Sequence, residues 1–395
     1  MKKNILFLFT FFVLFGLPNS YAQNNIVHSE KVYRVAIFAP MYLDSIFENG
    51  QLISQRTLPK SSMPAVEFVQ GAQIAFDTLQ LNGKRIEAFI YDSKSFTKSI
   101  FWLIRNKQLD SIDLIIGSVK EPDYSELAQF AVQRSIPFIS ATYPNDAGIK
   151  ENPFTVIVNS TLKAHCEGIF SYIMQKHGTD NIYLIKKKGD NRIDDYFKSI
   201  NTADGKQLLK IKTIILDSSI SSYGLRNLID TTKPIVIIGA SLDETFAKKL
   251  ADACYPIQKK NPLVLVGMPN WDGFKSLVKK SAFKDFPIRY TTPHYDTKDN
   301  PFSTFFSQRY FQLYRAKQPS DMAFKGFELT YYFTRMLLDY GNNFMQHLNE
   351  NNLVVFHDFN FKPVFSNKNN KVPDYYENKH LFIMEILNGE IEREW

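Results

Sequence analysis

The sequence predicts an α/β protein built as two doubly wound parallel-sheet lobes. Three observations lead to this fold class. Residues 112–143 form a strand–helix–strand unit, the same alternation of apolar strands and amphipathic helices recurs along the chain, and 395 residues are more than one compact core usually holds.

The unit in residues 112–143 sets the pattern. Ile112–Ile116 is a short, largely apolar run, which is typical of a strand buried on both faces. Glu121–Arg134 spaces its apolar residues as a helix does, and Ile136–Ile139 is a second buried strand. Strands joined in this way run parallel, with a right-handed crossover between them.

Strands of this kind predict the first lobe. Gly71 lies inside one of its helices, where glycine costs about 1 kcal/mol relative to alanine, so we expect that helix to approach the sheet closely there. The predicted strands are Tyr33–Phe38, Ile86–Tyr91, Ile112–Ile116, Ile136–Ile139 and Thr155–Val158, and the helices are Ala65–Leu81, Phe96–Arg105 and Glu121–Arg134.

A second alternation predicts the other lobe. It opens with a helix that Asn159–Thr161 caps. The strands that follow are Ile182–Ile185, Lys210–Ile215, Ile235–Ile238, Leu263–Val266 and Ile288–Thr291, and the helices between them are Arg192–Ile200, Ser221–Ile229, Glu244–Ala253 and Gly273–Lys279.

The rhythm changes after these elements. Phe302–Lys317 and Met322–Tyr340 are consecutive helices rich in aromatic residues, which we expect to pack in the core. Val354–Phe365 and Leu381–Leu387 have the composition of strands and are expected to pair, with the polar segment Ser366–Asn378 as the loop between them.

Residues 1–22 have the pattern of a secretory signal peptide. Lys2 and Lys3 precede an apolar segment, Ile5–Leu17, and Ser20–Ala22 supplies the small residues of a cleavage site. The apolar segment is too short to span a membrane. We therefore expect cleavage after Ala22 and export of the mature protein to the periplasm.

The charge of the chain is modest and dispersed. The formal charge is +7, and it falls to +5 when Lys2 and Lys3 leave with the signal peptide, because residues 1–22 contain no Asp or Glu. The longest basic run is Lys186–Lys188, which we expect in a solvated loop. Without a basic patch or a recognition motif, no nucleic-acid partner is expected.

Cysteine and histidine patterns argue against a metal centre and against catalysis. The two cysteines, Cys166 and Cys254, and the seven histidines form none of the usual metal-ligand spacings. No nucleophile elbow and no phosphate-binding loop is present. We expect neither an enzyme nor a cofactor. An exported protein could pair its two cysteines or keep them as buried thiols.

Small hydroxyl residues follow two neighbouring strands of the first lobe. Ser118 follows the strand that ends at Gly117, and Ser140, Ala141 and Thr142 follow the next one. Ligands of open α/β sheets bind at this carboxyl edge. Serine and threonine also cap helices and form turns there, so both readings stay open.

The order of elements, together with several phrases, resembles the type I periplasmic binding proteins of the leucine/isoleucine/valine-binding class. The phrases are YRVAIFAP, EFVQGAQIAFDTL, NGKRIEAFIYDS, DLIIGSV, SELAQFAVQRSIPFISAT and FFSQRYFQLYRAKQPSDMAFKGFELTYYF. The closing segment, ENKHLFIMEILNGEIE, resembles the final hairpin of the wider receptor ligand-binding family.

The resemblance implies a hinge that the chain crosses three times. The implied crossings lie near Val158–Thr161, Thr291–Tyr295 and Asn349–Val354. The first lobe would then comprise 23–158 and 296–348, and the second 159–291 and 353–395.

The resemblance also implies where a ligand binds. Ser118, Ala141 and Thr142 match the positions that hold an amino acid's carboxylate, and loops of the other lobe supply Asp190, Ser241, Asn270 and the adjacent Trp271. Family members that bind amino acids usually carry a carboxylate in the last of these loops, which this chain lacks at Asn270. Asp190 and Asp272 are the candidates to replace it. Tyr42, Tyr143 and Trp271 are expected at loop tips facing the cleft.

Two functions follow as hypotheses. The first is a solute-binding protein that closes on a small polar ligand, such as an amino acid or a cell-wall fragment, and serves a membrane permease of the ABC type or a sensing system. The second is an envelope interaction protein that regulates peptidoglycan synthesis and retains the clamp without transporting a solute. The missing carboxylate and the long polar segment Asp44–Ser62, expected as a loop at the cleft rim, favour the second hypothesis.

Overall fold

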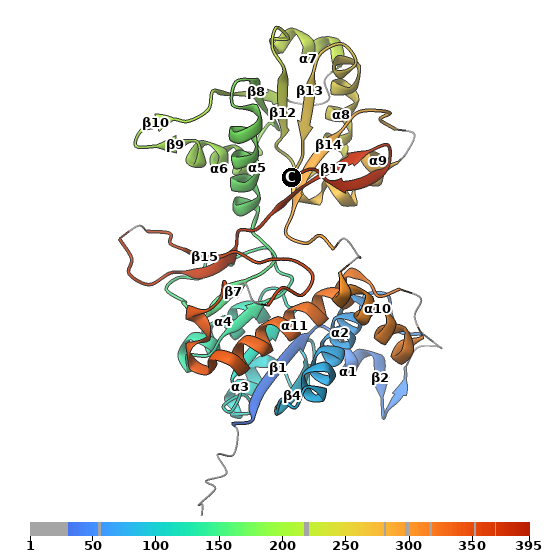
Figure 1. Ribbon diagram of the computed structural model, residues 1–395, viewed down its shortest axis with the longest axis vertical. Coiled ribbons are helices and arrows are strands. Elements are labelled where there is room, and N and C mark those ends of the chain that lie inside the picture. Colours follow the sequence, from blue (N-terminus) through green and yellow to red (C-terminus); the bar gives the residue numbers. More distant parts are fainter. Residues whose placement is uncertain are drawn as a thin grey trace, which may run out of the picture. The chain divides into compact units, whose positions relative to one another are not determined.

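The computed structural model describes residues 31–53, 57–216, 221–279, 282–296, 300–315, 318–350, 353–367 and 369–395. The predicted signal peptide lies outside these ranges. Within them, no helix combines the length and the apolar character that a membrane span requires. Two seven-stranded sheets organise the described part of the chain (Figure 1).

The first sheet is parallel except at one edge. Its edge pair, β15 and β16, is antiparallel, and every other neighbouring pair is parallel. In spatial order its strands are β15 (Phe361–Val364), β16 (Tyr375–Asn378), β7 (Thr155–Ile157), β6 (Phe138–Ser140), β5 (Leu114–Gly117), β1 (Tyr33–Ala39) and β4 (Ile86–Asp92).

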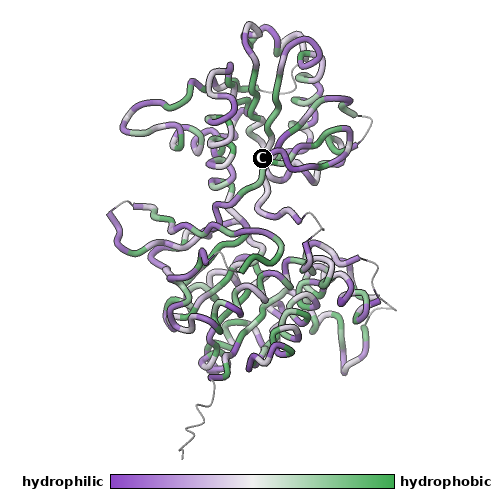
Figure 2. Tube along the Cα trace, viewed as in Figure 1, coloured by the Kyte–Doolittle hydropathy of each residue, from purple (hydrophilic) through white to green (hydrophobic). Residues whose placement is uncertain are grey.

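Helices cover both faces of this sheet because successive side chains of a strand point to opposite faces. Val35 and Ile37 of β1 pack with helices α2 (Met63–Leu81) and α11 (Asp321–Tyr340). Ala36 and Phe38 pack on the other face with α3 (Ile100–Arg105) and α4 (Asp123–Arg134). Hydrophobic residues accordingly follow the central strands in Figure 2.

The second sheet is parallel through its first five strands and ends in an antiparallel hairpin, as the resemblance implied. Its helices are α5 (Leu162–His177), α6 (Arg192–Ile200), α7 (Ser222–Leu228), α8 (Glu244–Gln258) and α9 (Lys275–Val278). Its strands in order are β11 (Ile211–Leu216), β8 (Asn181–Lys187), β12 (Ile235–Gly239), β13 (Leu263–Val266), β14 (Ile288–Thr292), β17 (Phe382–Leu387) and β18 (Glu390–Arg393).

These two sheets confirm the predicted fold class. The segment expected as a rim loop instead contains short elements within its described part. The remaining elements are α1 (Leu43–Ile46), the hairpin β2 (Phe47–Glu48) and β3 (Gln51–Leu52), the hairpin β9 (Thr202–Ala203) and β10 (Lys206–Gln207), η1 (Pro269–Gly273), α10 (Pro301–Tyr314) and η2 (Gly341–Gln346).

The last crossing between the sheets differs from the expected one. Residues 361–378 form β15 and β16 of the first sheet, because β16 pairs with β7, and the chain reaches the second sheet only after Asn378. The third crossing is therefore at residues 379–381 rather than at Asn349–Val354. The expected pairing of Val354–Phe365 with Leu381–Leu387 is also wrong, since β17 pairs with β14 and β18.

Two glycines allow helices α2 and α11 to pack closely along each other (Figure 1). A Cβ atom on Gly71 would lie 2.0 Å from the carbonyl oxygen of Ala323, and one on Gly326 would lie 2.0 Å from that of Phe68. Gly71 thus serves a helix–helix contact and not the helix–sheet contact that we expected. The contact holds α11 against the first lobe.

The thiols and the basic run also take definite positions. Cys166 and Cys254 are both free and buried. Lys186 lies in strand β8 with only 5% of its surface exposed, so the expectation of a solvated loop is wrong for this lysine. Its buried partner is Asp194 of α6.

Candidate functional site

A cavity of about 720 Å³ forms where the first two crossings meet helix α11. Asn159, Ser160, Leu162 and His165 line it at the first crossing, and residues 291–296 line it at the second. The loops after β6, β12 and β13 contribute Tyr143, Leu242 and Asn270. Both lobes therefore supply its walls, at the carboxyl edges of their parallel strands, where ligands of α/β sheets bind.

One face of α11 supplies the charged wall of the cavity. Asp321, Lys325 and Glu328 line it, together with Phe324. Residues spaced by three or four positions lie on the same side of a helix. The close approach of α2 at Gly71 and Gly326 fixes the opposite side of α11, so this charged face is held toward the cavity.

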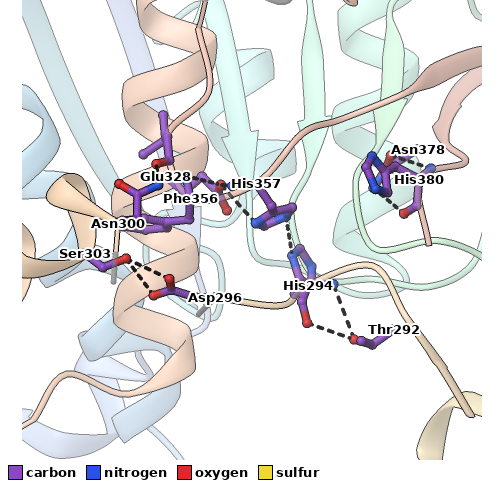
Figure 3. Close-up of polar contacts among 11 residues, drawn as sticks. Thr292, His294, Asp296, Asn300, Ser303, Glu328, Phe356, His357, Asn378 and His380 are labelled. Atoms are coloured by element: carbon purple, nitrogen blue, oxygen red, sulfur yellow. Dashed lines mark hydrogen bonds and ion pairs between the residues drawn. The ribbon is translucent and has the colours of Figure 1, made fainter. Parts of the chain in front are cut away.

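Glu328 on that face lies beside His294 and His357 from two other segments, and the three form a largely buried group (Figure 3). His294 Nδ1 and His357 Nε2 are 3.3 Å apart. Glu328 Oε1 accepts hydrogen bonds from the backbone N–H groups of Phe356 and His357, at 3.2 and 3.3 Å. The same oxygen lies 3.2 Å from His357 Nδ1, although that nitrogen lacks a hydrogen bond of good geometry among the described residues.

Burial sets the protonation of this group. It raises the pKa of Glu328 to about 8, although the hydrogen bonds from two backbone N–H groups act to lower that pKa. It lowers the pKa of His357 to about 3 and holds the pKa of His294 well below its usual value. At neutral pH the two imidazoles are neutral and Glu328 is largely protonated.

Groups of both signs surround the cavity. Arg192 contributes a guanidinium from the start of α6, and burial lowers the pKa of Lys325 on α11. Asp272 from η1 is a lining carboxylate whose pKa is raised by burial, although its side chain still reaches solvent. Asp296 lines the second crossing, and both of its carboxylate oxygens accept from the Ser303 hydroxyl at 2.8 Å.

Two of the sequence-predicted ligand residues line the cavity. Tyr143 follows β6 and packs edge-on against Tyr124, with ring centroids 5.2 Å apart. Asn270 precedes Asp272 in η1 and donates from Nδ2 to the carbonyl of Leu242 at 2.9 Å. Their contact with a solute remains a prediction.

The predicted hydroxyl cradle is assembled but covered. Ser118 and Thr142 lie together, with their hydroxyl oxygens 3.1 Å apart. Ser118 is 6% exposed, and Ser140 and Ala141 have no exposed surface. None of the four lines the cavity. A role for them in binding a solute therefore remains a prediction that requires this edge to open.

Two further predicted residues lie outside the cavity lining. Tyr42 adopts the left-handed conformation at the start of α1. Its backbone N–H, like those of Met41 and Leu43, donates to the carboxylate of Asp92, at 3.1, 2.9 and 2.6 Å. Asp190 lies in the turn after β8, where its N–H donates to the carbonyl of Lys187. Solute contacts at both positions remain predictions.

Ser241 and Trp271 act together in the core of the second lobe. Trp271 is fully buried, and its indole N–H donates to the carbonyl of Ser241 at 2.9 Å. Gly239 and Gly267 make room for the ring, because a Cβ on either would lie within 2.4 Å of it. The indole thus anchors the segment that carries Asn270 and Asp272. Neither Ser241 nor Trp271 lines the cavity.

The sequence reasoning missed most of the charged lining. The sequence does contain a signal for it, because the spacing of Asp321, Lys325 and Glu328 places them on one side of a helix. That predicted helix was interpreted only through its aromatic residues. His294 falls in a predicted crossing, but nothing local links it to Glu328 or His357. That grouping depends on tertiary structure, because its members come from three separate segments.

Comparison with known proteins defines the family. The sequence profile described as "Periplasmic binding protein" matches residues 59–374, which is most of the chain. A search of curated protein sequences gave no match. Among solved structures, one from Rhodospirillum rubrum, assigned as a branched-chain amino acid ABC transporter, is 12% identical with a TM-score of 0.65, and the match covers 92% of this chain and 100% of that one.

Two further structures share the fold. A branched-chain amino acid ABC transporter ligand-binding protein from Burkholderia xenovorans is 11% identical with a TM-score of 0.59, with 92% and 94% of the two chains covered. An ABC transporter substrate-binding protein from Desulfitobacterium hafniense, solved with Leu, is 11% identical with a TM-score of 0.54, with 92% and 100% covered. The family is one of binding proteins rather than enzymes, and on the match over residues 59–374 this chain belongs to the periplasmic binding protein family.

Proposed function

We propose that this chain is the exported solute-binding component of an ABC-type importer and that it holds a small amphoteric solute, with amino acids as the first class to test. The observation that carries the proposal is the cavity of about 720 Å³, which is lined by both lobes and by charges of both signs. Cavities of this size are typical of small-molecule sites.

The charges of the lining favour a solute that carries both signs. Arg192 and Lys325 offer cationic partners, and Asp272 and Asp321 offer carboxylates. When a closing site excludes water, every charge on the solute needs a partner, since an unpaired buried charge is strongly penalised. A solute with one ammonium and one carboxylate could pair the first with a lining carboxylate and the second with a lining cation.

Asp272 answers the objection that the sequence raised. Amino-acid binders were expected to use a carboxylate in the last loop of the second lobe, and Asn270 occupies that position. Asp272 lies two residues further along the same 3-10 helix and lines the cavity with Asn270. We assign it the role of pairing with the ammonium of the solute.

Binding would couple to closure of the lobes. A solute that touches residues of both lobes interacts more strongly with the closed arrangement, and this difference in affinity shifts the population toward closure. The three ABC transporter proteins of the same fold support transport as the purpose, and we propose a membrane permease as the partner and the periplasm as the location.

Isothermal titration calorimetry on the purified mature protein tests the proposal. The panel comprises amino acids, short peptides, nucleosides and cell-wall fragments. We expect micromolar binding of an amphoteric solute. Asp272→Asn removes a charge-assisted hydrogen bond and should weaken the binding free energy by about 1.5–3 kcal/mol. Asp252→Asn, at an exposed ion pair with Lys248 on α8, is the matched control and should bind normally.

The absence of binding across the panel at millimolar concentration would overturn the proposal. The envelope interaction protein would then be the remaining hypothesis. Normal binding by Asp272→Asn would keep a solute-binding function but remove the role assigned to this carboxylate.

A further inference from the structure

We propose that His294, His357 and Glu328 form a binding site for a divalent transition-metal ion of the zinc class at the hinge. Among the described residues, this is the group of histidine, cysteine and carboxylate side chains whose ligand atoms come close enough to share an ion. One ligand atom from each residue lies within 4.8 Å of the others.

The types of the three residues fit such an ion. Two imidazoles and one carboxylate are ligands that zinc takes in proteins, with bond lengths of about 2.0–2.2 Å. His357 faces both partners, with Nε2 3.3 Å from His294 Nδ1 and Nδ1 3.2 Å from Glu328 Oε1. A single ion would use only one of these two nitrogens, together with one atom each from His294 and Glu328, and three such atoms lie within 4.8 Å of one another.

The polar atoms of the group are incompletely satisfied without an ion. Glu328 is 2% exposed and His357 is 8% exposed. His294 Nε2 and His357 Nδ1 are buried and have no hydrogen-bond partner among the described residues. Buried polar atoms nearly always find a partner, so two such nitrogens beside a buried carboxyl group are suited to bind an ion.

The surroundings hold these residues in place from different parts of the chain (Figure 3). His294 follows β14 of the second sheet, and its N–H donates to the Thr292 hydroxyl at 3.3 Å. Glu328 is fixed on α11 by the two backbone N–H groups that it accepts from, one of them that of His357. An ion would thus join the second crossing to the first lobe beside the cavity, which all three residues line.

Lys325 is the feature that opposes the ion. Lys325 lies on the same face of α11 as Glu328, and its positive charge lowers the pKa of Glu328, His294 and His357. Asp321 and Asp272 in turn raise the pKa of Lys325. Two like charges near one another weaken each other's binding. Replacing Lys325 with methionine should therefore tighten metal binding. If the three residues only formed structural hydrogen bonds, this substitution would have no such effect.

The test uses the full mature protein after treatment with a chelator. Zinc is titrated by calorimetry and Co²⁺ by its visible absorption, which reports the coordination. We expect one ion per chain. His294→Ala and His357→Ala should each weaken the affinity by more than the roughly 10- to 100-fold that the loss of an outer-shell partner causes.

Two more variants keep the test decisive. Glu328→Gln keeps an acceptor for the backbone N–H groups but cannot ionise to bind a metal as a carboxylate, so it should fold and still lose affinity. His347→Ala is the matched control, because His347 lies 3.0 Å from Glu350 outside the cavity and should leave zinc binding unchanged.

Failure of the wild-type protein to take up Co²⁺ or zinc overturns the site, and so does normal binding by folded His294→Ala and His357→Ala. The titrations contain no organic solute. Their outcome is therefore independent of the solute-binding function proposed above.

Discussion

A buried ion pair joins strand β8 to helix α6. Lys186 Nζ lies 2.7 Å from Asp194 Oδ2, and the side chains are only 6% and 3% exposed. Asn191 accepts a second hydrogen bond from the same ammonium at 2.7 Å. Burial alone would raise the pKa of Asp194, but the hydrogen bonds from Lys186 and Lys198 outweigh it and lower the pKa overall.

Asp194→Asn should destabilise the protein by about 3–5 kcal/mol, because it leaves the Lys186 ammonium buried without its anion. Urea unfolding at pH 7 measures the effect. Asp252→Asn, whose exposed pair with Lys248 sits on α8, should change the free energy of unfolding by at most about 1 kcal/mol. Equal effects of the two substitutions would contradict this account.

The sign of the pH dependence follows from the lowered pKa of Asp194. A carboxylate whose folded pKa lies below its unfolded pKa binds fewer protons in the folded state. Its stabilisation is complete above the unfolded value of 3.8 and disappears as the pH falls through the folded value. The difference between wild type and Asp194→Asn should therefore shrink in strong acid.

His165 gives a separate prediction near neutral pH. It is 3% exposed, its Nδ1 lies 2.8 Å from the Thr291 hydroxyl, and burial together with the charge of Lys379 lowers its pKa to about 3. The unfolded chain therefore takes up a proton between pH 6.5 and 3 that the folded chain excludes. Stability should fall with decreasing pH in this window, by up to about 1.4 kcal/mol per pH unit.

His165→Asn should flatten this dependence, because asparagine keeps a group near Nδ1 that can bond Thr291 and does not titrate. Free energies of unfolding measured in urea from pH 7.5 to 4.5 would show the difference in slope. The prediction fails if both proteins lose stability in parallel over that range.

At the scale of elements, the contact between α2 and α11 positions the charged wall of the cavity. Gly326→Ala would put a Cβ 2.0 Å from the carbonyl oxygen of Phe68, so α11 must move away from α2. Overpacking of this kind costs about 1–3 kcal/mol. The shift also moves Lys325 and Glu328, so solute affinity should fall together with stability.

Gly273→Ala is the control for this substitution. No atom lies within 4 Å of the position that its Cβ would take, and its backbone lies outside the left-handed region. It should leave the free energy of unfolding within about 0.5 kcal/mol of wild type. A wild-type affinity in a destabilised Gly326→Ala would show that α11 does not set the cavity.

The elements that the sequence predicts well are those with strong local patterns. The strand–helix–strand unit of residues 112–143 and the parallel core of both sheets come from apolar runs that local periodicity identifies. Strand β16 escapes this method because Tyr375–Asn378 is short and polar, yet Glu377 and Asn378 are almost fully buried. Their hydrogen bonds to distant segments, and not an apolar pattern, hold the strand.

The candidate site is less predictable than the fold for the same reason. Tyr143 and Asn270 follow strands, so the sheet-edge rule finds them. His294, His357 and Glu328 do not lie at the end of one common strand. They come close only because the second crossing, α11 and the segment before β15 meet in the folded protein. Trp271 was found as an aromatic loop residue, but only its burial shows that it anchors the loop.

At the scale of the whole molecule, a polar network ties the first crossing to the third. The Thr161 N–H donates to Glu377 Oε1 at 2.7 Å, and the Ser160 hydroxyl donates to the Asn378 carbonyl at 2.7 Å. Lys379 pairs with the buried Glu377 and, at 2.8 Å, with Glu167 of α5. Burial lowers the pKa of Lys379, but the two glutamates raise it by more, so Lys379 is charged at neutral pH.

This network should make the two lobes unfold together. Lys379→Met leaves the Glu377 carboxylate buried without its cation, which costs about 3–5 kcal/mol for a buried pair. Because the loss falls on the hinge and not on either core, differential scanning calorimetry should show the transitions of the two lobes moving apart. Lys362→Met, on an exposed position of the same hairpin, should leave the thermogram unchanged.

The network should also affect solute binding, because Lys379 holds two of the segments that connect the lobes. Lys379 itself does not line the cavity. Lys379→Met should weaken the affinity for the solute with every lining residue intact. A raised folded pKa means that this stabilisation is present below pH 10.5 and is lost only as the pH rises through the folded value. A single undisturbed transition together with wild-type affinity in Lys379→Met at pH 7 would mean that the crossings act as independent linkers.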